Sequence, residues 1–140
     1  MKCLFMIQEQ VNNINLDVIT GSFKGPYICG DAIDIRDNLV LTGSCNSDYI
    51  QLWDLRNLKC EYDKFDDYIE GSIYSAQFGK KSFGIGQSSV NAFRSYNLED
   101  YSTDINLEYI DKAVYTIHYS YDGEYCAYSG ADSIIKIIKV

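Results

Sequence analysis

The residues Gly30–Leu55 read GDAIDIRDNLVLTGSCNSDYIQLWDL, and this stretch decides the fold. Short apolar runs separated by polar turns predict three strands, at Ala32–Ile35, Leu39–Ser44 and Tyr49–Leu55. The middle run is apolar on both of its faces, which is typical of a strand that lies between two neighbouring sheets. We therefore expect a small antiparallel sheet that other sheets cover on both sides.

The same pattern recurs twice further along the chain. The glycine of the middle strand, Gly43, has counterparts at Gly86 and Gly130, which follow at intervals of 43 and 44 residues. Such spacings are typical of β-propeller blades, in which about 40–45 residues form one four-stranded sheet. The further strands predicted are Lys2–Ile7, Asp17–Phe23, Lys59–Phe65, Ile73–Phe78, Phe83–Gln87, Val90–Phe93, Ser102–Leu107, Val114–Tyr119, Glu124–Gly130 and Ile135–Ile138.

The dipeptide Trp53-Asp54, at the end of a third strand, resembles the signature of WD-repeat proteins. Aligning the copies places Val90–Phe93 with Ile50–Trp53, so Phe93-Arg94 stands in the second copy where the first has Trp-Asp. The third copy resembles the family through YDGEY at 121–125 and SGAD at 129–132. The resemblance implies an all-β fold: a partial β-propeller of about three four-stranded antiparallel blades of WD-repeat type.

The resemblance also implies how the chain is divided and which residues support it. Residues 25–67 and 68–110 would each be a WD-type blade, and 111–140 a final blade that lacks its outer strand. Residues 1–24 would be the tail of a preceding blade or a ring-closing strand. Trp53 would pack between blades, and Asp31 stands where many family members have a structural histidine. The residues expected to have structural roles are Gly30, Asp31, Gly43, Trp53, Asp54, Gly86, Asp122, Gly123 and Gly130.

Three blades are too few to close a ring, because known propellers have about four to eight. An open arc leaves two blade faces uncovered. If each face offers on the order of 600 Å² of apolar surface, leaving it in water forgoes about 15 kcal/mol, as much as the whole stability of a typical domain. We therefore expect a protein partner, a second copy or more of the same polypeptide to cover these faces.

The resemblance places partner-binding residues in the loops at one end of the blades. The residues expected to contact proteins are Tyr27, Ile28, Cys29, Cys45, Asn46, Tyr68, Ser88 and Lys112. This arrangement favours a non-enzymatic scaffold, a structural subunit of a larger eukaryotic assembly, located in the cytoplasm with a cytoskeletal or ciliary complex as one setting. The alternative is an adaptor that recruits client proteins by reading peptides. Few Arg or Lys residues are expected on its reading face, which counts against phosphorylated clients.

Composition and charge exclude other classes of function. A formal net charge of −8 and a pI near 4.5 argue against nucleic acids and anionic membranes as partners. We expect no cofactor, metal or small-molecule substrate, since His118 is the only histidine and no nucleophile–base motif or phosphate loop is present. The five cysteines form no C-x-x-C pair, which favours reduced thiols buried in strands and a reducing compartment.

Overall fold

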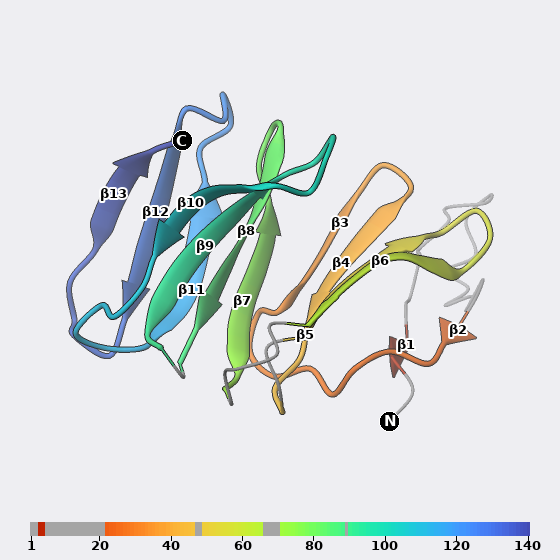
Figure 1. The fold of residues 1–140 in the computed structure, drawn as a ribbon, viewed down its shortest axis with the longest axis horizontal. Helices are drawn as coiled ribbons and strands as arrows, with labels where there is room; N and C mark the ends of the chain where they lie inside the picture. Colours follow the sequence, from red (N-terminus) through yellow and green to blue (C-terminus); the bar gives the residue numbers. More distant parts are fainter. Residues whose placement is uncertain (1–2, 5–21, 47–48, 66–70, 89) are drawn as a thin grey trace, which may run out of the picture.

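A computed structural model of the chain describes residues 3–4, 22–46, 49–65, 71–88 and 90–140. The described residues form strands and turns and no helix, which confirms the prediction of an all-β fold. Three antiparallel sheets of three or four strands lie in a row, together with a two-stranded ribbon (Figure 1). The row does not close on itself.

Each sheet is a meander in which consecutive strands are neighbours. The first sheet contains β3 (Ile33–Arg36), β4 (Leu39–Gly43), β5 (Tyr49–Asp54) and β6 (Lys59–Phe65). The second contains β7 (Ile73–Phe78), β8 (Ser82–Gln87), β9 (Ala92–Asn97) and β10 (Thr103–Leu107). The third contains only β11 (Val114–Tyr119), β12 (Tyr125–Gly130) and β13 (Lys136–Lys139). The ribbon pairs β1 (Cys3–Leu4) with β2 (Ser22–Phe23).

The first strands of the three sheets, β3, β7 and β11, lie next to one another. The Asp31 N–H donates to the Tyr74 carbonyl at 2.8 Å, and the Ala76 N–H donates to the Asp31 carbonyl at 3.0 Å. The Ile117 N–H donates to Ser75 Oγ at 3.2 Å. Backbone groups are therefore bonded between sheets as well as within them, which fixes the position of each sheet relative to the next.

Two apolar cores lie between the sheets. The core between the first and second sheets contains Ala32, Leu41, Ile50, Leu52, Ile73, Ala76, Phe83, Ile85 and Tyr96. The core between the second and third contains Phe93, Val114, Ile117, Tyr119, Cys126 and Tyr128. The second sheet contributes to both cores, so it lies between the other two sheets.

The structure corrects the alignment of the repeats. Leu58 and Tyr101 donate their N–H groups to the carbonyls of Asp54 and Asn97, four residues earlier, and both have a positive φ. The equivalent turns are thus 43 residues apart, and Tyr96-Asn97 corresponds to Trp53-Asp54. The predicted equivalence of Val90–Phe93 with Ile50–Trp53 is wrong, because Val90 lies in a turn and β9 begins at Ala92.

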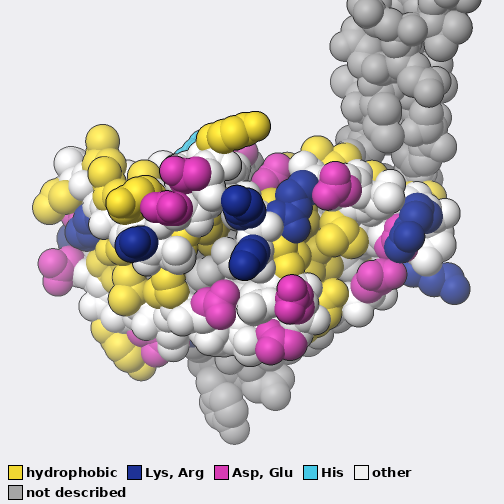
Figure 2. Space-filling model, turned by 90° about the horizontal axis from the view of Figure 1, so that it is seen from above, with side chains coloured by type: hydrophobic (Ala, Val, Ile, Leu, Met, Phe, Trp, Pro, Cys, Tyr) yellow, Lys and Arg dark blue, Asp and Glu magenta, His cyan; other side chains and the backbone are white. Residues whose placement is uncertain are grey.

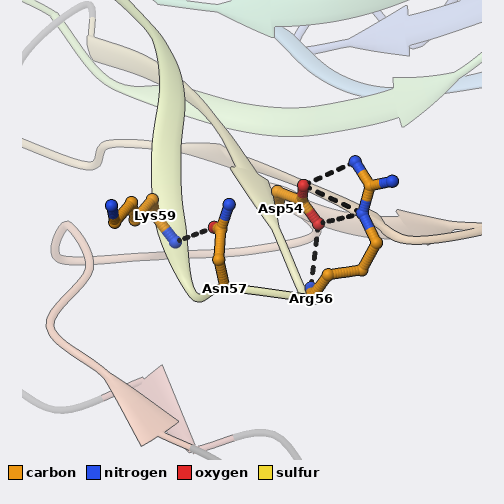
Figure 3. A network of polar contacts seen from close by, with 4 residues as sticks. All are labelled: Asp54, Arg56, Asn57 and Lys59. Carbon is orange, nitrogen blue, oxygen red and sulfur yellow. Dashed lines mark hydrogen bonds and ion pairs between the residues drawn. The ribbon is translucent and has the colours of Figure 1, made fainter.

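Asp54 and Asn97 hold these turns in the same way. Asp54 Oδ1 accepts the Arg56 N–H at 2.8 Å, and Asn97 Oδ1 accepts the Glu99 N–H at 2.7 Å. Asp54 also binds the Arg56 guanidinium, with Nη2 2.7 Å from Oδ2 (Figure 3). These hydrogen bonds lower the pKa of Asp54 from 3.8 to about 2. Asn57 Oδ1 accepts the Lys59 N–H at 2.9 Å and leads the chain into β6.

Trp53 is buried on the face of the first sheet that points away from the second. Its indole Nε1 donates to Thr42 Oγ1 at 3.0 Å, and its ring stacks on Phe23 with the ring centres 4.5 Å apart. Gly30 precedes this sheet with a φ of 60°. A Cβ on Gly30 would lie 2.7 Å from the Tyr74 carbonyl oxygen, so glycine permits the close approach of the second sheet.

The Asp122-Gly123 turn joins β11 to β12 as the sequence predicts. Asp122 Oδ1 accepts from Ser120 Oγ at 2.6 Å and from the Glu124 N–H at 3.0 Å. Gly123 has a φ of 73°, a conformation that glycine adopts without strain. The turn resembles the Asp-containing turns that begin the outer strands, because a carboxylate again accepts a backbone N–H two residues later.

Glycines at one repeated position allow neighbouring sheets to touch. A Cβ on Gly43 would lie 2.9 Å from Ile73 Cβ, and one on Gly86 would lie 2.7 Å from Val114 Cγ1. Gly130 is not the third member of this set, contrary to the predicted alignment. Ser129 pairs with Thr116 as Gly86 pairs with Ser75, so the third sheet has a serine at this position.

Two cysteines form a disulfide, which contradicts the prediction of reduced thiols. Cys29 and Cys45 are bonded, with their Cα atoms 5.4 Å apart, while the buried Cys126 is free. The pair joins the segment before β3 to the loop after β4. Their separation of 16 residues gave no indication of the pairing, which depends on the β3–β4 hairpin bringing its two ends together. The inference of a reducing compartment therefore loses this part of its basis.

The described part of the amino-terminal segment does not pair with the third sheet. This part, β1, pairs with β2 and lies beside the first sheet (Figure 1). The remaining residues of the predicted Lys2–Ile7 strand lie outside the described residues.

Adding a methyl group between two sheets should destabilise the fold. Gly86→Ala would place its Cβ against Val114 Cγ1 and 3.1 Å from the Val114 carbonyl oxygen, and overpacking of this kind costs about 1–3 kcal/mol. Urea unfolding followed by fluorescence of the one tryptophan measures the loss. Ser129→Ala, at the same position of the uncovered sheet, should change stability by less than about 0.5 kcal/mol. Equal effects of the two variants would contradict the role of Gly86.

The disulfide should protect two thiols and stabilise the fold. Alkylation of the urea-unfolded chain should modify two fewer cysteines before reduction than after it, and peptide mapping should assign the difference to Cys29 and Cys45. A crosslink that closes a loop of this size stabilises by about 3 kcal/mol, so a reductant should lower the urea midpoint. The Cys29→Ser/Cys45→Ser variant should not respond to the reductant. A full set of reactive thiols without reduction would refute the pairing.

The Asp54 carboxylate should stabilise the fold in a pH-dependent way. Folding lowers its pKa to about 2, so its contribution is complete above about pH 5 and is lost as the pH falls towards 2. Asp54→Asn keeps the acceptor for the turn, as Asn97 does, and loses the ion pair. The difference in urea midpoint between wild type and Asp54→Asn should therefore shrink to zero by about pH 2. A constant difference from pH 2 to 7 would show that the charge is not involved.

Candidate functional site

The outer face of the third sheet is the largest departure from the repeat. The pairs Leu41–Leu52, Gly84–Ser95 and Ala127–Ile137 are equivalent in the three sheets, and each lies on the face that points towards the following sheet. Extending the same register places Ile135 at the position of Ile50 and Phe93. These positions can therefore be compared directly.

The comparison shows which face has lost its cover. Ile50 and Leu52 are 2% and 1% exposed, and Phe93 is fully buried. Ile135 and Ile137, at the same repeat positions, are 75% and 69% exposed. Tyr125 adds a half-exposed ring on the same face of β12. We call Tyr125, Ala127, Ile135 and Ile137 the open face.

The opposite face of the third sheet is packed and contains two groups with raised pKa values. Burial raises the pKa of Tyr119 to about 12, and its hydroxyl donates to Ser95 Oγ at 3.2 Å. Burial likewise raises the pKa of the Cys126 thiol to about 12. Both groups are therefore neutral near pH 7, and the thiol has little nucleophilic character. Their role in this core is packing.

The hairpin ends of the three sheets form a second surface. A hollow of about 850 Å³ is lined by Arg36, Asp37, Phe78, Gly79, Lys80 and 119–122, so it lies between the tips of all three hairpins. Arg36 donates to the carbonyls of Gly79 and Lys80, and its guanidinium lies 5.0 Å from the centre of the Phe78 ring. The first and second hairpins are thus held together here.

A smaller hollow at the same end lies between the second and third sheets. Its volume is about 560 Å³, and its lining includes the cations Lys80, Lys81 and Lys139 against the single carboxylate Asp104. Seen from this end, Lys and Arg side chains gather near the middle of the molecule, with Asp and Glu side chains around them (Figure 2). Lys80 and Lys81 are exposed in the turn between β7 and β8; both line the smaller hollow, and Lys80 also lines the larger one.

The residues predicted to bind proteins lie at the other end of the sheets, and four of them are joined. Cys29 is bonded to Cys45, and the Cys45 N–H donates to the Tyr27 carbonyl at 2.7 Å. Ser72, which the sequence did not single out, donates from Oγ to the Cys45 carbonyl at 2.5 Å and accepts the Ser88 N–H at its own carbonyl at 3.1 Å. These contacts form a bridge from the first sheet to the second.

The other predicted residues do not form one site with this bridge. Ile28 packs against the first core, while Tyr27, Asn46 and Lys112 are exposed. Tyr68 lies outside the described residues. The hydrogen bonds around Cys45 join backbone groups of the first sheet to Ser72 at the start of the second, so their role here is structural.

The described residues provide little for catalysis. Among them, no group of three or more His, Cys, Asp and Glu side chains is placed to hold a metal ion. His118 is exposed on β11, where its Nδ1 lies 2.8 Å from the Tyr119 carbonyl oxygen. In the described part of the chain we find no helix with the length and apolar character that a membrane span requires.

The sequence predicted uncovered blade faces, but sequence reasoning identified neither the residues of the open face nor the lysine-lined hollow. Ile135 and Ile137 were assigned to a strand, but their exposure follows from the absence of a neighbour, which periodicity alone does not show. A signal was present in the repeat itself, because Ile135 and Ile137 fall in a third strand whose counterparts in the other copies are apolar core strands. The hollow needed Lys139 to be placed beside a hairpin nearly 60 residues earlier.

In comparisons with known proteins, no family model and no curated protein matches this chain.

Proposed function

We propose that the three sheets are blades of an incomplete β-propeller of the WD-repeat type, and that the protein is a non-enzymatic scaffold. Its open face would pack against another polypeptide as the first two sheets pack against their neighbours. The observation that carries the proposal is the exposure of Ile135 and Ile137 at repeat positions that are buried in both earlier sheets.

The energetic argument supports contact with protein. Burying one isoleucine side chain contributes about 1.5–3 kcal/mol, so the two isoleucines together would contribute about 3–6 kcal/mol to an interface. Tyr125 would add a ring with a polar end, a side chain that is enriched at the centres of protein interfaces. A net charge of −8 makes nucleic acid a poor alternative partner.

The shape of the site also favours a sheet-like partner. The equivalent face of the second sheet, around Gly84 and Gly86, is covered by β11 and β12 through Ile117, Val114 and Tyr119. Ala127 and Ser129 occupy these glycine positions in the third sheet and are small as well. A partner that covers them would therefore approach closely, with β-branched and aromatic side chains pointing inwards.

A photoreactive amino acid in place of Ile137 should crosslink to the covering polypeptide. We expect an adduct of defined mass, either between two copies of the purified chain or with one protein in native extract. The same amino acid in place of Ile35, an exposed isoleucine of the first sheet, provides the control. A purified chain that is a folded monomer in sedimentation velocity, with no adduct at position 137 beyond that at position 35, would overturn the proposal.

The substitution Ile137→Asp separates an interface role from a folding role. Because Ile137 is 69% exposed, this variant should keep the urea midpoint of wild type within about 0.5 kcal/mol. It should nevertheless weaken association about tenfold or more, since it places a charge in an apolar contact. Ile35→Asp should leave association unchanged. Equal association of the two variants would contradict docking on the open face.

A further inference from the structure

The free edge of β13 differs from the corresponding edges of the other two sheets. In those sheets the third strand pairs with a fourth, β5 with β6 and β9 with β10. Among the described residues, β13 pairs with β12 alone, so the backbone groups along its other edge have no strand partner. Such an edge is a template for an added strand.

The residue that ends β13 determines how a fourth strand could arrive. Asp54 pairs with Leu39, Asn97 with Ser82 and Lys139 with Tyr125, so the three residues are equivalent. Asp54 and Asn97 accept the N–H two residues later and thereby start the turn to the outer strand. Lysine has no side-chain acceptor and cannot form this bond. The third sheet therefore lacks the device by which the other two sheets turn into their own outer strands.

Lys139 instead adds its charge to the hollow between the second and third sheets. Lys80 and Lys81 from the β7–β8 hairpin line the same hollow, and Ser82, Ser95 and Asn97 add groups that can hydrogen-bond. No ion pair between described residues involves these three lysines. Three ammonium groups and one acidic side chain, Asp104, line this hollow, which makes its side chains net cationic on a chain whose net charge is −8.

The direction of an added strand brings its amino-terminal side to this site. Outer strands run antiparallel to the third strand, and β10 begins with Thr103 opposite Tyr96, one residue before Asn97. A strand on β13 would likewise begin beside Ile138 and Lys139, so the residues just before it would pass the lysines. We propose that the β13 edge binds an extended segment of another polypeptide with acidic residues on its amino-terminal side. This inference rests on the proposed scaffold function and deepens it.

A competing explanation is that the lysine only protects the edge. Lysines on edge strands prevent unwanted pairing, and Lys139 would then act alone. That explanation leaves the position of Lys80 and Lys81, on a different sheet, without a reason. It also predicts that charge reversal at Lys80 and Lys81 has no effect on a bound strand, so the two explanations are separable.

The chain itself supplies a suitable probe. The segment 99–107, EDYSTDINL, forms the outer strand of the second sheet and carries two acidic residues before that strand. We would measure binding of this peptide, blocked at both ends and labelled with a fluorophore, to the full chain by fluorescence anisotropy. A peptide in which both leading acids are lysines should bind about tenfold more weakly, and the difference should vanish near 1 M salt.

Variants of the chain test the site directly. Lys139→Glu and Lys80→Glu/Lys81→Glu should each weaken peptide binding about tenfold, whereas Lys24→Glu, at an exposed lysine outside the hollow, should not. Hydrogen exchange of residues 136–139 should slow when the peptide binds. No binding, or equal binding to all variants, would overturn the inference. Ile137→Asp reports on the open face independently, so unchanged association of that variant together with normal peptide binding would refute the scaffold proposal and leave the edge site standing.

Discussion

Close contact between consecutive sheets is the constraint on which the rest of this structure depends. In β8, for example, Phe83 and Ile85 point into the core shared with the first sheet. Gly84 and Gly86 lie on the opposite face, where their lack of a side chain allows the third sheet to pack closely. Each sheet is stable only where both of its faces are covered, since the apolar surface that would otherwise be wet is comparable to the stability of a domain. The repeat therefore requires a covering neighbour on each face of a sheet, and the described residues provide none for the outer face of the third sheet.

The strands themselves could be predicted because their signals are local. Alternation and turn residues gave β6, β7 and β11 with the same ends that the structure has, and the Asp-Gly turn before β12 was also predicted. The error at β9 arose from aligning apolar residues alone. Asn97 repeats the role of Asp54 by accepting a backbone N–H. A search for the dipeptide Trp-Asp alone overlooks this equivalence, because asparagine can accept the same hydrogen bond. Equivalent positions of the repeats in this chain are recognised more easily by the hydrogen bonds of their turns than by the identity of their core residues.

The features that sequence reasoning missed depend on distant residues meeting in space. Cys29 and Cys45 pair because one hairpin returns the chain to its starting edge, and the lysine-lined hollow exists because the third sheet sits over the second. Exposure is also a property of the whole assembly, since Leu52 and Ile137 are similar residues in similar strands with opposite surroundings. The predicted protein-binding residues illustrate the converse, because Cys45 and Ser88 lie at the predicted end of the sheets and their backbone groups take part in joining the first sheet to the second.

One repeated position lies in the third strand of each sheet, on the face opposite to that of Ile135 and Ile137. It shows how the third sheet differs from the first two and still keeps its core. Gln51, Arg94 and Lys136 are equivalent, since they pair with Thr42, Ile85 and Tyr128. Arg94 is buried and satisfied by Asn106 and Glu108 near the end of β10, and Arg94 lowers the pKa of Glu108. Among the described residues no outer strand supplies such a partner to Lys136, which pairs with Asp132 from its own loop, over the Tyr128 ring. On its buried face, the third sheet thus finds within itself the partner that a fourth strand provides in the second sheet. On the open face, no described residue covers Ile135 and Ile137. We therefore expect the buried face to be complete and the open face to bind another polypeptide.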